Sequence, residues 1–208
     1  MNYIELRIPV TGNRIPTHHG YDLFSAICRH VPQAHDSDWL AIDTLTGVAN
    51  GNGTTHLDPT AKLKIRVPQE RVTLMLELAG KQLNLGESQI QLGTPQIGLL
   101  RPSSSLHARI VTIKNHQQEG TFSAAVRQKL DSLSVTGEIG IGMRRVVKVS
   151  NYVVVGFAVT LYGLSNESSI LLQEKSIGGR RHFGCGYFNP VRSLAFVNHN
   201  NQHSTFSE

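Results

Sequence analysis

Apolar and polar residues alternate along several short stretches of the chain, and this period of two is typical of β-strands. The first such stretch is residues 3–10, YIELRIPV, and a second covers residues 62–67, where three cations alternate with three apolar residues. Strands are also predicted at residues 39–46, 89–92, 96–100, 106–114, 140–149, 153–164 and 187–191. Residues 140–149 and 153–164 are expected to form a hairpin that turns near Ser150 and Asn151.

Three other segments carry apolar residues at the three- and four-residue spacing of a helix face. They are residues 20–31, which Pro32 ends, residues 69–80 and residues 122–133, and a short helix or turn is expected at residues 166–175. The order βαββαβ therefore occurs twice. We predict an α+β fold of two tandem ferredoxin-like (βαββαβ) halves, residues 1–100 and 101–192, followed by a polar tail, residues 193–208, that we expect to be disordered.

The distribution of charge separates the two predicted halves. Residues 1–100 contain eight Lys and Arg against nine Asp and Glu, whereas residues 101–192 contain twelve against five. A basic half beside a neutral half indicates a surface for a polyanion, although an ordinary solvated basic surface explains the same count. The chain has no apolar run of membrane-spanning length, no secretory signal pattern and only two cysteines, so we expect a cytoplasmic protein that neither contacts a membrane nor relies on disulfides.

The segment Gly178–Gly186, GGRRHFGCG, has the composition of an anion-binding loop. Glycines permit close approach of the backbone to a ligand, and two adjacent arginines supply forked donors that match phosphate oxygens. The neighbouring Phe183, Tyr187 and Phe188 are aromatic groups that can stack on bases. We therefore predict that this loop, which we call the G-loop, binds RNA phosphates; the alternative is a glycine-rich turn whose aromatic residues belong to the core.

Two other phosphate-binding motifs do not match the G-loop. A nucleotide triphosphatase loop requires Gly-Lys-Ser/Thr, which the sequence lacks. A dinucleotide-binding loop belongs to a first βαβ unit, whereas this one lies near the C-terminal end of the chain.

The G-loop also resembles that of a known family. Ile177-Gly178, five residues that include both arginines, and then Gly184-Cys185-Gly186 resemble the C-terminal loop of CRISPR precursor-RNA processing endoribonucleases, within the repeat-associated RNA-binding superfamily. IPTHHGYDLFSAICRHVP, LAGKQLNLG and ARIVTIK are similar to segments of the short MYXAN-type variant. The resemblance extends over residues 3–190, and it departs from the common pattern at Ser176, where many members have glycine.

The resemblance implies two ferredoxin-like folds that recognise a CRISPR repeat RNA and cut it once without metal or cofactor. It also implies that the mature guide RNA often stays bound and joins other subunits of an effector complex. The expected RNA-binding residues lie in the G-loop, on the predicted hairpin and at the end of the strand before it: Gly178, Gly179, Arg180, Arg181, His182, Gly184, Gly186, Arg144, Arg145, Lys148 and Lys114.

RNA cleavage without metal uses the 2′-hydroxyl as nucleophile and leaves a 2′,3′-cyclic phosphate, so it needs a base and an acid. Histidine suits both roles because its pKa lies near neutral pH. We expect His19 and His35 to be catalytic, with Tyr21 as a substitute for one of them. His19 precedes the first predicted helix, whose positive end favours neutral imidazole. The helix is about 17 Å long, so the two histidines meet only if residues 32–36 fold back.

Other functions remain open at this point. A zinc site would have to use His18, His30, His35 and Cys28, whose spacing matches no standard ligand set. A non-catalytic subunit that only holds guide RNA would share the G-loop, so that only the histidines distinguish it from an enzyme. A generic ferredoxin-like RNA-binding module would have no preference for a repeat.

Overall fold

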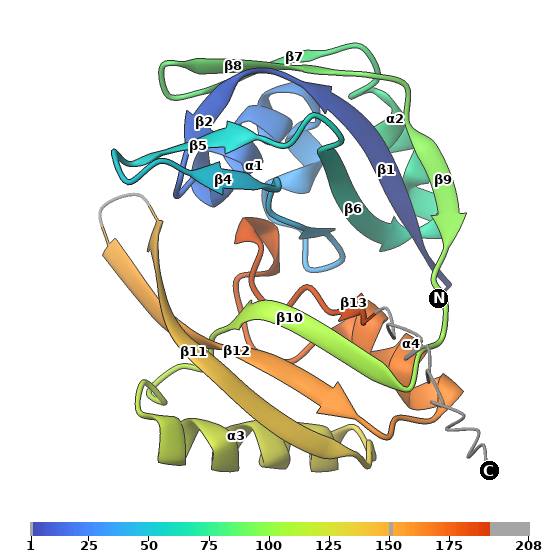
Figure 1. Cartoon of the computed structure of the whole chain (residues 1–208). Helices are drawn as coiled ribbons and strands as arrows, with labels where there is room; N and C mark the ends of the chain where they lie inside the picture. The colour runs from blue at the N-terminus through green and yellow to red at the C-terminus, as the bar shows by residue number, and fades with distance from the viewer. Residues whose placement is uncertain (1, 150–151, 192–208) are drawn as a thin grey trace, which may run out of the picture.

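The computed structural model describes residues 2–149 and 152–191, so the expected hairpin turn at Ser150-Asn151 and the tail 193–208 lie outside the described residues. The elements in chain order are β1 (Tyr3–Thr11), β2 (Arg14–Pro16), α1 (Gly20–His30), η1 (Pro32–Ala34), β3 (Ala41–Ile42), β4 (Gly47–Ala49), β5 (Thr54–Leu57), β6 (Lys62–Pro68), η2 (Gln69–Arg71), α2 (Val72–Leu76), β7 (Gln82–Leu85), β8 (Ser88–Leu92), β9 (Gln96–Leu99), β10 (Ser105–Val111), α3 (Glu119–Ser132), β11 (Glu138–Val149), β12 (Tyr152–Tyr162), α4 (Asn166–Lys175), η3 (Arg181–Phe183) and β13 (Asn189–Pro190) (Figure 1).

An antiparallel sheet of order β3-β6-β1-β8-β7, with β9 also paired to β1, forms the centre of the first half. The alternation in β1 and β6 directs Leu6, Ile8, Leu63 and Ile65 to one face, where they are fully buried together with Leu23 and Ile27 of α1. A separate three-stranded sheet, β2-β5-β4, extends beside α1.

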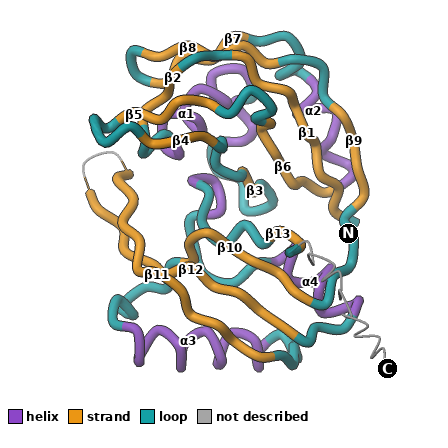
Figure 2. Tube along the Cα trace, in the orientation of Figure 1, coloured by secondary structure: helices purple, strands orange, loops and turns teal. Residues whose placement is uncertain are grey.

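A four-stranded antiparallel sheet of order β11-β12-β10-β13 forms the centre of the second half. Helix α3 covers the face of this sheet that points away from the first half (Figure 1), and its Phe122, Val126 and Leu130 pack into a second core. In Figure 2 the short helical turn η3 lies between the two sheets, where it contacts α1. The last part of the chain therefore returns to the first half.

The predicted α+β fold with ferredoxin-like halves is confirmed, but three elements are shorter than their sequence pattern suggested. Residues 39–46 contribute only Ala41–Ile42 to a strand, and residues 187–191 only Asn189–Pro190. The predicted helix 69–80 is a 3₁₀ turn followed by Val72–Leu76. Beyond Leu76 the chain tightens into i→i+3 hydrogen bonds and turns at Gly80, whose φ is +67°.

None of the helices in the described residues is both long and apolar enough to cross a lipid bilayer. The two cysteines, Cys28 and Cys185, are free thiols.

Candidate functional site

The G-loop docks directly on the first turn of α1. Gly20 begins that helix, and a Cβ atom at this position would lie 2.6 Å from the carbonyl oxygen of Phe183. The rings of Tyr21 and Phe24 lie 5.9 and 5.5 Å from the ring of Phe183, and His182 stacks on Phe24 at 4.7 Å. Residues more than 150 positions apart in the sequence thus share one aromatic cluster.

His35 joins this cluster because the chain folds back after α1. The turn Pro32–Ala34 reverses the chain, and the imidazole of His35 stacks on Phe24 with ring centroids 6.5 Å apart. Its side chain remains 72% exposed, and its Nδ1 lies 2.9 Å from a carboxylate oxygen of Asp36. Residues 32–35 therefore fold back toward α1, as they must if residues at the two ends of this helix are to act together.

Tyr21 and His35 line the same shallow depression of about 290 Å³, together with Phe24, Ser25, Cys28 and Arg29. Arg29 was not predicted from the sequence, although its spacing from Tyr21 indicates that the two residues share a helix face. Tyr21, Ser25 and Arg29 are four residues apart, so they follow one face of α1. The depression therefore combines a phenol, an imidazole and a guanidinium near the G-loop.

His19 lies apart from this depression and is 4% exposed. Its Nδ1 is 2.9 Å from the carbonyl oxygen of Pro16, and its Nε2 accepts a hydrogen bond of 3.0 Å from the backbone N–H of Leu45. Burial lowers the pKa of His19, which keeps the imidazole neutral as expected. Both ring nitrogens are nevertheless occupied, so this geometry does not support the expected transfer of a proton to RNA.

The glycines of the G-loop serve close packing within the protein. Gly178, Gly184 and Gly186 have φ values of +83°, +80° and +68°, and a Cβ at any of them would collide with Thr112, Thr44 or Ser176. The N–H groups of Gly179, Phe183, Cys185 and Gly186 donate to carbonyl groups of the protein. These four donors are used internally instead of converging on an anion, which differs from the simple anion cradle that the composition suggested.

The two arginines of the G-loop have different environments. Arg180 is exposed, and its guanidinium lies 5.7 Å from the ring of Tyr152 on the hairpin. Arg181 donates to the carbonyl oxygens of Glu174 and Asp38, and burial lowers its pKa. The expectation that Arg181 contacts RNA is therefore not supported, because its guanidinium already joins α4 to the loop after η1.

The expected aromatic stacking platform is also largely internal. Tyr187 and Phe188 are 3% and 0% exposed, and only Phe183 is half-buried. The hydroxyl of Tyr187 donates to Glu5, which pairs with the buried guanidinium of Arg66. Arg66, one of the three cations that alternate along residues 62–67, is 1% exposed and donates to the carbonyl oxygen of Phe188.

The hairpin β11–β12 carries the other expected cations. Arg144 and Lys148 are exposed, and Arg145 is half-buried. Desolvation and then the charges of Lys148 and Arg109 lower the pKa of His18, so the turn end of the hairpin, where Lys148 lies, is near the start of α1. Sequence reasoning missed Arg109, which occupies an exposed alternating position of β10.

Within residues 2–149 and 152–191, no group of three or more His, Cys, Asp or Glu side chains is arranged to hold a metal ion.

Comparisons with known proteins agree with this architecture. A family model described as Cas6 Crispr matches residues 4–193. The chain is 39% identical over 204 residues to a CRISPR-associated endonuclease Cas6 of Myxococcus xanthus strain DK1622, a match that covers 95% of this chain and 85% of that protein.

Solved structures share the fold at low sequence identity. A Cas6-related protein from Pyrococcus furiosus has a TM-score of 0.64 at 11% identity, covering 92% of this chain and 99% of that one. Cse3 of Thermus thermophilus, described as bound to an RNA representing a pre-cleavage complex, has a TM-score of 0.55 at 11% identity, covering 91% and 98%. The resemblance seen in the sequence is therefore confirmed, and the chain belongs to the Cas6 family of CRISPR-associated endonucleases.

Proposed function

We propose that this protein cleaves CRISPR precursor RNA within its repeats, without a metal ion, by attack of a 2′-hydroxyl on the adjacent phosphate. The observation that carries the proposal is the meeting of Tyr21 and His35 with the G-loop on the open side of α1. The product would carry a 2′,3′-cyclic phosphate and the leaving strand a 5′-hydroxyl. The pre-cleavage RNA complex described for Thermus thermophilus Cse3 supports RNA as the substrate class.

In this proposal His35 is the principal proton-transfer group. An Nδ1–H donated to Asp36 would orient the ring and leave Nε2 for proton transfer with RNA. Tyr21 lines the same depression, and its phenol hydroxyl is the second proton-transfer group. The exposed guanidinium of Arg29 donates one N–H to the carbonyl oxygen of Asn84, and its other N–H groups offset charge that develops on the phosphate. His19 instead holds Leu45 and Pro16 in place beside the start of α1.

RNA binding is assigned to the exposed cations of the G-loop, the hairpin and the segment after β10. Arg180, Arg144 and Lys148 border the G-loop and the hairpin, and Lys114 follows β10. Arg145 contributes from the middle of the hairpin, and Gly178, Gly179, His182, Gly184 and Gly186 shape the loop that presents Arg180. We propose that the mature guide remains on this surface and enters an effector complex with other subunits.

The test incubates the purified protein with its repeat RNA in the presence of EDTA and maps both RNA termini. We expect a 2′,3′-cyclic phosphate product, and we expect His35→Ala to reduce the single-turnover rate about 10²-fold or more, the usual contribution of a general acid or base. His30→Ala, at the last residue of α1, is the matched control and should cleave normally, because His30 does not line the depression.

Unchanged cleavage by His35→Ala would refute the assignment of His35. Repeat RNA bound tightly but left intact by the unmodified protein would instead identify a non-catalytic guide-binding subunit. Cleavage that stops in EDTA would contradict a reaction without metal.

A further inference from the structure

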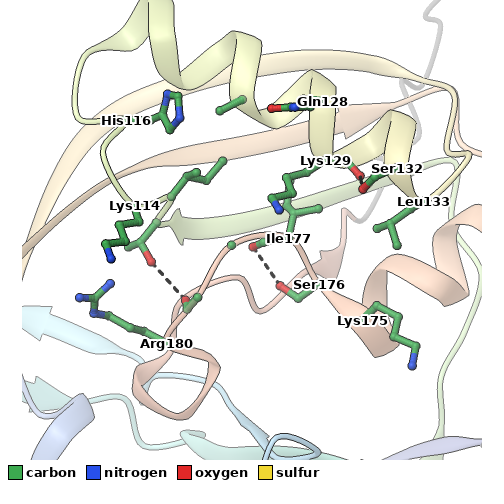
Figure 3. A pocket seen from close by; sticks show the side chains of 15 residues that line it. Lys114, His116, Gln128, Lys129, Ser132, Leu133, Lys175, Ser176, Ile177 and Arg180 are labelled. Carbon is green, nitrogen blue, oxygen red and sulfur yellow. Dashed lines mark hydrogen bonds between the residues drawn. The ribbon is translucent and has the colours of Figure 1, made fainter.

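A second concave site lies on the opposite side of the G-loop from Tyr21 and His35. It is a pocket of about 680 Å³ between the end of β10, helix α3 and residues 175–180 (Figure 3). Thr112 Oγ1 donates to the carbonyl oxygen of Gly179, and Gly179 N–H donates to the carbonyl oxygen of Thr112. These bonds fix the G-loop as one wall of the pocket.

The residues around the pocket are strongly cationic. Lys114 and Arg180 lie side by side at one end, and Lys129 projects from α3 toward the loop (Figure 3). Lys175 comes from the end of α4. Among the described residues that line the pocket none is acidic, and none of these cations forms an ion pair with a described carboxylate. Uncompensated cations in a concave site attract an anion.

The pocket also has an apolar lining and a polar atom that lacks a partner. Ile113, Ala125, Leu133 and Ile177 supply the apolar surface. His116 lines the same pocket, and its Nδ1 is buried without a hydrogen-bond partner among the described residues. An apolar floor, a cationic rim and one unpartnered imidazole nitrogen fit a ligand that combines a flat ring with a phosphate, and the volume lies in the ordinary range of small-molecule sites.

The G-loop connects this pocket to the depression on α1. Arg180 lines the pocket, and three residues later Phe183 contacts Tyr21. A 3₁₀ turn rises about 2 Å per residue, so this connection is only about 6 Å long. An RNA strand that reaches Tyr21 and His35 can therefore continue over Arg180 into the pocket.

We propose that this pocket, lined by Lys114, Lys129, Lys175, Arg180 and His116, seats one unpaired nucleotide of the bound repeat RNA. The base of this nucleotide would lie on the apolar floor of the pocket, and its flanking phosphates would contact the lysine and arginine side chains. The inference rests on the proposed function, because it takes repeat RNA to be the ligand.

The charge test measures affinity for a repeat RNA with a 2′-deoxy substitution at the cleaved position, so that binding is observed without cleavage. Lys129→Ala/Lys175→Ala should raise the Kd about tenfold and reduce the slope of log K against log salt by about 1, as expected for the loss of one to two phosphate contacts. Arg14→Ala/Lys81→Ala removes equal charge from exposed sites in the first half and should leave Kd within about twofold.

The shape test fills the pocket without removing charge. A Cβ at Gly179 meets nothing within 4 Å, and its φ is not left-handed, so Gly179→Leu should fold normally, which a thermal melt checks. We expect a higher Kd with an unchanged salt slope. If Lys129→Ala/Lys175→Ala keeps the Kd and the salt slope of the unmodified protein, the pocket does not bind RNA. If Gly179→Leu keeps the Kd of the unmodified protein, the pocket does not hold a base.

The outcomes also separate this inference from the proposed function. If the unmodified protein binds and cleaves repeat RNA while the pocket variants match it, only the pocket assignment fails. AMP binding that the lysine variant abolishes, with RNA affinity unchanged, would assign the pocket to a free nucleotide and overturn the RNA subsite. If the unmodified protein neither binds nor cleaves repeat RNA, both proposals fail.

Discussion

At the residue scale, His19 shows how two hydrogen bonds determine a protonation state. Nδ1 contacts a carbonyl oxygen, which can only accept, and Nε2 contacts a backbone N–H, which can only donate. Only neutral imidazole with its proton on Nδ1 satisfies both. Protonation of Nε2 would place two N–H groups against each other in a buried site.

The stability of the protein should therefore depend on His19 below neutral pH. Burial lowers the pKa of His19 below its ordinary value of 6.5, so the unfolded chain takes up a proton more readily than the folded one. Stability is then lost as the pH falls below about 6.5. His19→Gln, which keeps a donor and an acceptor, should show a smaller loss in urea denaturation between pH 7.5 and 5.5, and His19→Ala should cost about 1–3 kcal/mol at pH 7.5.

His30→Gln, at the opposite end of α1 from His19, is the control for this measurement and should leave the pH dependence unchanged. Parallel stability curves for the unmodified protein and His19→Gln would contradict a proton-linked role for His19. His182, whose pKa burial also lowers, should retain part of the dependence in every variant.

The same scale shows what local sequence can and cannot predict about a site. Tyr21, His35 and Arg180 were named from their type and position, and the structure places Tyr21 and His35 around one depression on α1 and Arg180 in a pocket across the G-loop. The burial of Arg66 and Arg181 was not predicted, because an arginine on an alternating strand or in a glycine-rich loop is normally exposed. Their burial depends on partners more than 100 positions away for Arg66 and on the return of the G-loop for Arg181.

At the element scale, the contact between α1 and the G-loop depends on the absence of one side chain. Alanine normally stabilises a helix relative to glycine by about 0.5–1 kcal/mol. At Gly20, however, the added methyl group would lie 2.6 Å from the carbonyl oxygen of Phe183. Gly20→Ala should therefore displace the G-loop, lower the melting temperature and weaken cleavage of repeat RNA.

Gly120 provides a matched comparison near the start of α3. A Cβ at Gly120 meets nothing within 4 Å, so Gly120→Ala should keep cleavage and leave the melting temperature unchanged or slightly raised. Equal melting temperatures and cleavage rates for the two alanine variants would show that the G-loop does not need close contact with α1.

Elements with a long, regular pattern were predictable within a few residues. The predicted strands at 3–10, 62–67 and 106–114 and the helix at 122–133 match observed elements, because their apolar faces follow a local period. The helix predicted at 69–80 ends at Leu76, since the following turn is set by how the chain packs and not by its period. The small sheet β2-β5-β4 was not predicted, because its three short strands carry little alternation.

At the scale of the whole molecule, one buried network joins the two halves. Glu5 and Arg66 come from the first half, and Arg66 Nε and Nη2 each lie 3.0 Å from Glu5 Oε2. Arg66 also donates to the carbonyl oxygen of Phe188 at 2.7 Å, and the hydroxyl of Tyr187 donates to Glu5. Burial alone would raise the pKa of Glu5, but the Arg66 charge and the hydrogen bonds of Arg7 and Tyr187 lower it. The relative position of the α1 depression and the second half thus depends on a carboxylate that must stay charged.

Removal of the Arg66 guanidinium should therefore weaken the contact between the halves more than removal of the Arg7 guanidinium, which is the more exposed partner of Glu5. Arg66→Met leaves Glu5 buried without its main counterion and should cost about 3–5 kcal/mol at pH 7. Arg7→Met removes a half-exposed guanidinium and should cost less than about 1 kcal/mol. The lowered pKa of Glu5 contributes stability that is fully present above about pH 4.5 and is lost as the pH falls below that value, so the difference between Arg66→Met and the unmodified protein should narrow below about pH 4.5.

Urea denaturation can follow the two halves separately, because the single tryptophan, Trp39, packs against the first core and circular dichroism reports both. Coincident transitions in the unmodified protein and separated ones in Arg66→Met would show that the network couples the halves. A small cost that does not change with pH would refute this role, because a neutral contact would lose the same free energy at every pH. The proposed RNA-binding surface spans both halves, so we expect Arg66→Met to weaken repeat-RNA cleavage even where the folded fraction is high.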